Sequence, residues 1–246
     1  ARHRRGRSGG EAERPLRQLS PVLDARLAAA AALVRPGHRA ADIGCDHGLL
    51  TAALVGSGRC PFVVAADLRS GPLSVAEKNL TKAGLMNKVS LRLGDGLSVL
   101  APGEVQDVVI AGMGAETICD IIAAAPWLRD PAVRLVLVPA TKHSILRRWL
   151  CRNGFALREE RLAQVGRRFY AVMAAEYRGQ PFEPEGQFCL LGLTKGLEGW
   201  RAYLRQQLPK LQKYRLGAPP EERQPIDALL ARLEGMLEDT AQSSEV

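Results

Sequence analysis

The sequence predicts an α/β fold in which a parallel sheet alternates with helices and is followed by a helical hairpin. Five short apolar runs without strict alternation are typical of buried parallel strands, and helical patterns lie between them. Beyond residue 180 the pattern changes to two amphipathic helices separated by a turn that contains glycine and prolines. At 246 residues the chain is long enough to bury a sizeable core.

The predicted elements of the α/β part follow a regular order. A first helix begins at Ser20 or Pro21 and ends at Arg35-Pro36-Gly37. The parallel strands are placed at residues 40–43, 62–66, 89–93, 108–111 and 135–138. The helices between them are placed at residues 48–55, 72–83, 116–124 and 144–153. Ser70 is the candidate cap of the second of these helices, and Pro72 lies in its first turn.

Two further pairs of elements complete the chain. Residues 156–164 and 168–177 are expected to form an antiparallel strand pair that turns at residues 165–167. The two last helices, at residues 196–216 and 220–240, are mainly basic and mainly acidic, so we expect them to pair antiparallel. The chain is thus divided into a basic tail at 1–19, an α/β domain at 20–180 and a helical hairpin at 184–246.

Composition narrows the possible environments of the protein. No apolar stretch reaches the roughly 20 residues that a membrane span needs, so no membrane role is expected. The five cysteines are scattered, with no C-x-x-C pair and no histidine at ligand spacing. We therefore expect neither disulfides nor a metal site, and the thiols point to a reducing cytoplasm.

Positive charge is concentrated in two regions of a chain whose net charge is +8. Residues 1–19 hold six arginines against two glutamates and are expected to be disordered; a transit peptide, an RNA-binding arm and a start-site extension all remain open. Residues 141–178 hold nine lysines and arginines against three glutamates. This second excess suits a polyanion such as nucleic acid, although an ordinary solvated surface explains it equally well.

The most informative motif is the run from Asp42 to Gly48, where an apolar strand passes into a loop of small and acidic residues. A second apolar run ends in Asp67, nineteen residues after Gly48, where a carboxylate can accept both hydroxyls of a ribose. Asp46 stands where a dinucleotide-binding loop has the glycine that admits a pyrophosphate. Carboxylates repel phosphates, so the loop favours S-adenosylmethionine, which carries a sulfonium and an ammonium group and no phosphate.

The ends of the third and fourth strands supply further candidates. Asp95, between two glycines, could accept a hydrogen bond from an adenine amino group, although a plain turn has the same residues. Met113 lies in a sharp turn of small residues, where substrate would meet cofactor. His47 could donate to a substrate or stack on it; a loop histidine bonded to backbone is an equal alternative.

These motifs together resemble those of the TrmK family, bacterial tRNA methyltransferases that act on N1 of adenine 22 in the D-arm. The resemblance covers residues 22–178 and is carried by Ala41-Asp42-Ile43-Gly44-Cys45-Asp46-His47, Gly71-Pro72-Leu73, Gly94-Asp95-Gly96-Leu97 and Ala111-Gly112-Met113-Gly114. It implies a Rossmann-like class I methyltransferase fold with seven strands, and it likens the last two helices to the family's C-terminal coiled coil.

The resemblance also implies roles for individual residues, with S-adenosyl-L-methionine as the cofactor and tRNA as the partner. The expected cofactor contacts are Asp42, Gly44, Cys45, Asp46, Gly48, Asp67, Leu68, Asp95, Gly96, Ala111, Gly112 and Met113. The expected reaction pocket holds Asp46, His47, Met113 and Gly114. From the charge pattern, the candidate RNA contacts are Lys142, Arg147, Arg148, Arg201 and Arg205. We expect the protein to act as a monomer.

Three departures from the family pattern keep the methyl acceptor open. The family reads A-Y-L-P after the histidine, a second glycine after A-G-M-G, and Q-P-N after the fifth strand. The corresponding residues here are Gly48-Leu49-Leu50-Thr51, Ala115 and Val138-Pro139-Ala140. Without polar groups beside Pro139, the alternatives are another RNA position, a small-molecule acceptor, or a non-catalytic RNA-associated protein that binds the cofactor. A nicotinamide-dependent dehydrogenase comes last.

Overall fold

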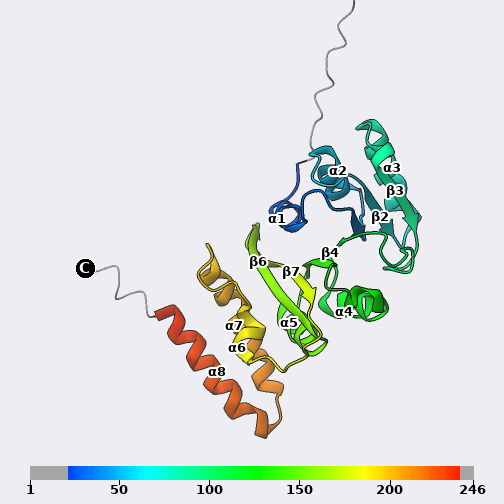
Figure 1. The fold of residues 1–246 in the computed structure, drawn as a ribbon. Coiled ribbons are helices and arrows are strands. Elements are labelled where there is room, and N and C mark those ends of the chain that lie inside the picture. The colour runs from blue at the N-terminus through cyan, green and yellow to red at the C-terminus, as the bar shows by residue number, and fades with distance from the viewer. Residues whose placement is uncertain (1–21, 239–246) are drawn as a thin grey trace, which may run out of the picture.

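The computed structural model describes residues 22–238, and their core is a seven-stranded sheet in the order β3-β2-β1-β4-β5-β7-β6 (Figure 1). The strands are β1 (Ala40–Ile43), β2 (Val63–Asp67), β3 (Val89–Leu93), β4 (Asp107–Ala111), β5 (Arg134–Val138), β6 (Phe155–Val165) and β7 (Arg168–Tyr177). The first five are parallel, and β7 is antiparallel to both of its neighbours. The predicted sheet is confirmed, with each strand within one residue of its expected position.

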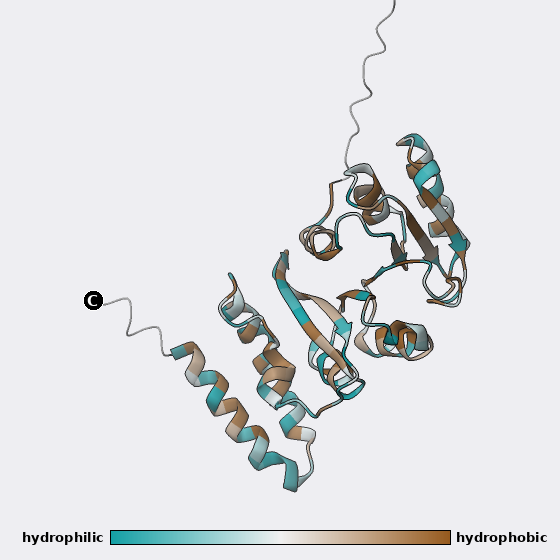
Figure 2. Ribbon diagram, viewed as in Figure 1, coloured by the Kyte–Doolittle hydropathy of each residue, from teal (hydrophilic) through white to brown (hydrophobic). Residues whose placement is uncertain are grey.

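Helices cover both faces of this sheet. One face packs on α1 (Ala25–Leu33), α2 (Leu49–Gly56) and α3 (Ser70–Lys82), and the other on α4 (Ala115–Ala123) and α5 (His143–Arg152). Alternate residues of each strand serve the two cores, so Ala40 packs with the first set of helices and Ala41 with the second. Burial on both faces explains why the central strands are mostly apolar, as Figure 2 shows.

The C-terminal segment packs onto the second face rather than standing apart from it. It comprises α6 (Gly186–Leu191), α7 (Trp200–Gly217) and α8 (Pro220–Glu238). In Figure 1, α7 and α8 run side by side, and α7 lies next to β7. Tyr203 and Leu204 of α7 are fully buried in the same core as α4 and α5. The expected charge pairing is present, since Arg215 of α7 lies 2.8 Å from Asp227 of α8.

Four details differ from the sequence prediction. The first helix begins at Ala25, because the Asp24 side chain accepts hydrogen bonds from the backbone N–H groups of Arg26 and Leu27. Ser70 is the first residue of α3 rather than its cap. Helix α6 was not predicted, because six residues are too few for a helical period. Helix α7 begins at Trp200 because Gly199 before it adopts a positive φ.

Two short 3-10 turns, Met86–Lys88 and Pro126–Arg129, complete the described elements. In residues 22–238, no helix is long and apolar enough to cross a membrane. The five cysteines, Cys45, Cys60, Cys119, Cys151 and Cys189, are all buried and free. The predicted disordered tail at 1–19 lies outside the described residues.

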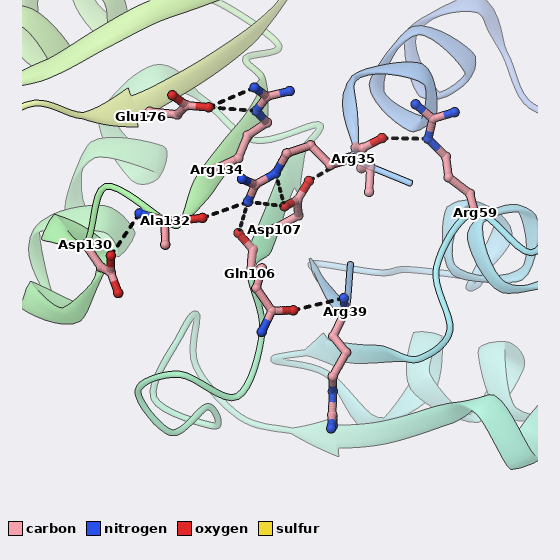
Figure 3. A network of polar contacts seen from close by, with 10 residues as sticks. Arg35, Arg39, Arg59, Gln106, Asp107, Asp130, Ala132, Arg134 and Glu176 are labelled. Carbon is pink, nitrogen blue, oxygen red and sulfur yellow. Dashed lines mark hydrogen bonds and ion pairs between the residues drawn. The ribbon is translucent and has the colours of Figure 1, made fainter. Parts of the chain in front are cut away.

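A polar network joins the elements at the amino ends of the central strands (Figure 3). The Arg35 guanidinium, just after α1, donates to the Asp107 carboxylate of β4 at 2.8 and 2.6 Å and to the carbonyls of Gln106 and Ala132. The Asp107 side chain is completely buried. Nearby, Arg134 of β5 donates to Glu176 of β7. This network holds the sheet edge opposite to the site described next.

Candidate active site

A cavity of about 1090 Å³ opens at the carboxyl edge of the sheet, where the strand order reverses between β1 and β4. Open α/β sheets bind ligands at such a reversal, because the adjacent loops diverge there. Most of the predicted site residues line this cavity: Asp42, Gly44, Cys45, Asp46, His47, Asp67, Leu68, Asp95, Gly96, Ala111, Gly112 and Met113. Gly48 and Gly114 do not line it, and each supports the loop beside it as the N-cap of a helix.

The loop after β1 is shaped by glycines that lie very close to neighbouring residues. Gly44 has a φ of +73°, and its N–H donates to the Ala66 carbonyl at 2.8 Å. A Cβ added to Gly44 would lie 2.3 Å from the Met113 methyl group, so glycine opens the floor of the cavity. Gly48 also has a positive φ, and a Cβ there would lie 3.0 Å from Ala76. The sequence therefore produces a narrow cradle between β1 and β4.

Asp42 is the most buried acid of the cavity. Its Oδ2 accepts a hydrogen bond from the Thr51 hydroxyl at 2.7 Å. Burial raises the pKa of Asp42 to about 6, with a smaller contribution from the nearby Asp67. A cation in the cavity would relieve this cost, because an opposite charge favours the ionised carboxylate. Thr51, which the family pattern replaces with proline, thus holds this carboxylate in place.

Asp67 ends β2 with its side chain almost fully buried. Its two oxygens accept hydrogen bonds from the backbone N–H groups of Asp46 at 3.2 Å and Arg69 at 2.9 Å. A carboxylate has about four acceptor positions, so both oxygens keep capacity for a ligand such as a ribose. Asp67 also fixes the β1 loop, because its bond to Asp46 joins the two strand ends.

Asp46 and His47 form the exposed lip of the cavity. Their side chains are 63% and 54% exposed, and His47 Nε2 lies 3.7 Å from Asp46 Oδ1. Asp46 has a φ of 48°, a left-handed conformation that aspartate tolerates better than most residues. Both side chains can turn toward a ligand that enters from solvent.

The opposite wall is built by the turn after β4. The Ala140 N–H donates to the Met113 carbonyl at 2.8 Å, and Gly114 pairs with Thr141 in an isolated bridge. These contacts tie the turn after β4 to the loop after β5. Val138 also lines the cavity, so this wall carries an apolar side chain, as the sequence position of Val138 indicated.

The sequence reasoning missed several lining residues. Arg26 and Leu27 come from the start of α1, Thr117, Asp120 and Ile121 from one side of α4, and Trp127 from the turn after it. A Cβ added to Gly96 would lie 3.3 Å from Ile121, which places this side chain against the predicted adenine-binding turn. The amphipathic pattern of α4 was visible in the sequence. The position of α1 against the cavity mouth depends on packing, and no motif signals it.

The predicted RNA contacts differ in their accessibility. Lys142 and Arg205 are exposed, Arg148 is 46% exposed and paired with Glu183, and Arg201 is half-buried against the Trp200 ring. Arg147 is a correction, because its side chain is completely buried and cannot reach an RNA backbone. It donates to Glu160, to the carbonyls of Cys189 and Leu190 and to the Tyr203 hydroxyl. Arg147 therefore joins α5 and β6 to the C-terminal segment.

Residues 23–173 match the family described as "Methyltransferase domain". This match takes in all of the parallel strands and the cavity, and the chain belongs to that family of methyltransferase domains. The tRNA (adenine(22)-N(1))-methyltransferase of Bacillus subtilis is 33% identical to the chain over 154 residues. The aligned stretch spans 63% of the chain and 65% of the length of that relative.

Solved structures extend the similarity to the C-terminal helices. The B. subtilis m1A22 tRNA methyltransferase TrmK superposes with a TM-score of 0.73 at 27% identity, covering 89% of the chain and 98% of that structure. Streptococcus pneumoniae Sp1610, solved in complex with S-adenosyl-L-methionine, gives a TM-score of 0.74 at 26% identity, covering 88% and 100%. The fold expected from the sequence is therefore confirmed.

Proposed function

We propose that this protein is an S-adenosylmethionine-dependent methyltransferase that methylates N1 of adenine 22 in the D-arm of tRNA. The observation that carries the proposal is the cavity at the β1–β4 reversal, with the acids Asp42, Asp46, Asp67 and Asp95 in its lining. Such a lining suits a cofactor with cationic groups and a ribose. The B. subtilis relative, named for this reaction, supports the choice of acceptor.

The residues present fit this cofactor. Gly44 lines the cavity, and a side chain there would meet Met113, so glycine keeps the floor open for a close ligand. In the proposed arrangement Asp67 holds the ribose, Asp95 and Gly96 hold the adenine ring, and Asp42 and Asp46 face the cationic end. The other expected contacts, at Cys45, Leu68, Ala111 and Gly112, fill the walls around it.

When bound, S-adenosylmethionine supplies a sulfonium methyl group, which the lone pair of adenine N1 can take directly while positive charge passes from sulfur to the purine. No general base is required, so this chain's task is alignment and exclusion of water. Met113 and Gly112 shape the floor where the two reactants meet. Asp46 and His47, at the lip, are placed to close over the acceptor base. Because N1 lies on the pairing edge, the base must leave its pair, at a cost of a few kcal/mol.

A transfer assay tests the proposal. Tritium from the methyl group of S-adenosylmethionine should enter unmodified total tRNA, and nucleoside mapping should place it at N1 of adenine 22. Label at another RNA position or in a small molecule would show that the proposed methyl acceptor is wrong. If calorimetry detects cofactor binding but no methyl group is transferred, the protein is a non-catalytic protein that binds the cofactor. If a nicotinamide dinucleotide binds more tightly than S-adenosylmethionine, the proposal that the protein transfers methyl groups is wrong.

Asp46→Asn provides the matched variant for this assay. The change removes one negative charge and keeps the size of an exposed side chain, so the fold should be unaffected. We expect weaker cofactor binding by calorimetry, and a proportionate loss of transfer at low cofactor concentration. An unchanged affinity would remove Asp46 from the cofactor site.

A further inference from the structure

Within residues 141–178, the positive charge that has no ion-pair partner is concentrated at one place. Of the nine lysines and arginines in residues 141–178, seven lie within 4 Å of a carboxylate: Lys142, Arg147, Arg148, Arg152, Arg158, Arg161 and Arg178. Within the described residues, only Arg167 and Arg168 of this set have no such partner. Both lie at the tip of the β6–β7 hairpin and are exposed.

The strand register places this tip at the same edge of the sheet as the cavity. The pairing of β5 with β7 runs from Arg134–Glu176 to Leu137–Met173. Because the two strands are antiparallel, the first residues of β7 extend beyond the carboxyl end of β5, on the same edge as the cavity. Arg168 and Tyr170 thus stand past Val138, which lines the acceptor side.

Tyr170 connects the tip to the cavity wall. The Arg26 guanidinium lies 5.0 Å from the centre of the Tyr170 ring, and the Arg168 guanidinium lies 5.6 Å from it. Asp24 accepts from Arg26 Nε at 3.2 Å and from Nη2 at 2.6 Å. In the described part of the chain, Arg26 Nη1 has no hydrogen-bond partner, so its second edge is available. Arg26 itself lines the cavity.

Helix α7 fixes the position of the tip and adds a third cation. The Gln206 side chain accepts from the Phe169 N–H at 2.7 Å and donates to the Phe169 carbonyl at 2.8 Å, which holds the backbone beside Arg168. Lys210 lies one helical turn after Gln206, on the same face of α7, so it is next to this bonded backbone. Burial, together with the charge of Arg168, lowers the pKa of Lys210. Like charges held together in this way are stabilised by an anion between them.

We propose that Arg26, Arg168 and Lys210 form a phosphate-binding subsite that holds the RNA backbone beside the nucleotide whose base enters the cavity. This inference rests on the proposed function and adds contacts that the charge pattern of the sequence did not single out. β7 and α7 each supply one cation, and α1 supplies Arg26, whose charge is paired with Asp24 but whose second edge is free to hydrogen-bond an anion. The acidic interior of the cavity repels phosphate. A cationic rim at the acceptor side would therefore hold the RNA backbone outside the cavity, while the methyl donor binds inside it.

The subsite predicts a specific salt dependence. Arg168→Ala and Lys210→Ala should each weaken tRNA binding about tenfold, because each removes a charged hydrogen bond to a phosphate. The slope of log affinity against log salt concentration should fall by about one for each variant. Arg168→Lys should retain most of the slope, since it retains the charge. Affinity for S-adenosylmethionine, measured by calorimetry, should stay within twofold for all three.

Arg161→Ala is the matched control. It removes the same charge from an exposed arginine of the same hairpin, but Glu159 already neutralises Arg161 at 3.0 Å. Its salt slope should therefore equal that of the unmodified protein. Equal slopes for Arg168→Ala and Arg161→Ala would overturn the subsite.

Arg26→Ala decides which anion its free edge binds. A loss of tRNA affinity with unchanged cofactor affinity supports the subsite. A loss of affinity for S-adenosylmethionine, but not for its decarboxylated analogue, would overturn the role of Arg26, because the cofactor carboxylate would then be its partner. If the unmodified protein binds tRNA with the predicted slopes and transfers no methyl group, the proposed function fails while the subsite stands.

Discussion

At the scale of one residue, Asp42 lowers the stability of the folded protein at neutral pH and favours the binding of a cation. The carboxyl group is buried and held by Thr51, and burial raises its pKa to about 6. The folded protein therefore binds this proton more tightly than the unfolded chain does. Asp42 supports folding below its ordinary pKa near 4, and this support is lost as the pH rises through 6. At neutral pH the group is ionised at a cost that a bound cation can offset.

Asp42→Asn should therefore stabilise the ligand-free protein and weaken cofactor binding. The amide keeps the size of the side chain and can accept the Thr51 hydrogen bond. The gain in unfolding free energy at pH 7.5 should be at most about 3 kcal/mol, because each pKa unit corresponds to about 1.4 kcal/mol. Urea denaturation and calorimetry measure the two effects. A variant that is less stable and binds the cofactor equally well would contradict this account.

Arg147 shows the limit of sequence reasoning at the same scale. Its position in a basic segment favoured a surface contact, but the C-terminal helices cover this side of α5. Arg26 is the opposite case, because nothing in a short alanine-rich helix indicates that its first turn borders a cavity. The residues predicted at strand ends line one cavity, since parallel strands bring their carboxyl ends to one edge. Whether a side chain is covered by an element distant in sequence can be seen only in the tertiary structure.

At the scale of elements, a buried polar cluster joins the C-terminal segment to the α/β domain. Arg147 Nε donates to Glu160 Oε1 at 2.9 Å, and Nη2 lies 2.9 Å from the same oxygen. The Leu193 N–H, after α6, donates to the other oxygen of Glu160. A Cβ at Gly192 would lie 2.0 Å from Glu160 Oε2, so only glycine fits between these groups. The cluster therefore fixes where the chain turns from the sheet into α7.

Arg147→Met should destabilise the protein by about 3–5 kcal/mol, because Glu160 would remain buried without its partner. The double variant Arg147→Met with Glu160→Gln should lose less than the sum of the two single changes, since no unpaired charge remains. Chemical denaturation of the four proteins gives this coupling directly. Strict additivity would mean that the two side chains do not act as a pair.

The start of α5 adds a pH dependence to the same region. His143 Nδ1 lies 2.9 Å from the Tyr203 hydroxyl, and burial, with the charge of Arg147, lowers the pKa of His143 to about 3. The unfolded chain takes up this proton below pH 6.5, and the folded protein does not. The stabilising effect of a neutral His143 is therefore complete above pH 6.5 and is lost as the pH falls toward 3.

Between pH 6.5 and 5, this residue should lower the unfolding free energy by up to about 1.4 kcal/mol per pH unit. His143→Gln should remove close to one proton from the measured pH slope. His47→Gln is the control, because His47 is exposed and lies outside this cluster. Equal slopes in the two variants would show that His143 is accessible to protons in the folded protein.

At the scale of the whole molecule, the two ends of the parallel strands have different roles. Residues at one end stabilise the fold, and residues at the other end form the candidate site. The amino edge carries the network of Arg35 and Asp107 (Figure 3). The carboxyl edge carries the cavity. The sequence predicted the strands because apolar runs mark them, and it predicted the hairpin because its two halves flank a glycine turn. It could not predict this polar network, whose members lie about 70 residues apart.

Asp107→Asn should test this separation. Removing the charge leaves the Arg35 guanidinium without its main partner, so we expect a loss of about 3 kcal/mol in unfolding free energy. Cofactor affinity should stay within twofold at a temperature where the variant is folded. Urea denaturation and calorimetry on the same sample check both results. A large loss of affinity in the folded variant would show that the two edges are coupled.

The burial of all five thiols has a practical consequence. Burial raises the pKa of Cys45 and Cys119 to about 12 and that of Cys60 and Cys151 to about 11, so little thiolate forms near neutral pH. Maleimide reagents should leave the native protein unlabelled over minutes. A cysteine introduced at exposed Arg167 would then be the preferred attachment point for a fluorophore at the hairpin tip. Docking of a nucleic acid could be followed there without removing any native cysteine.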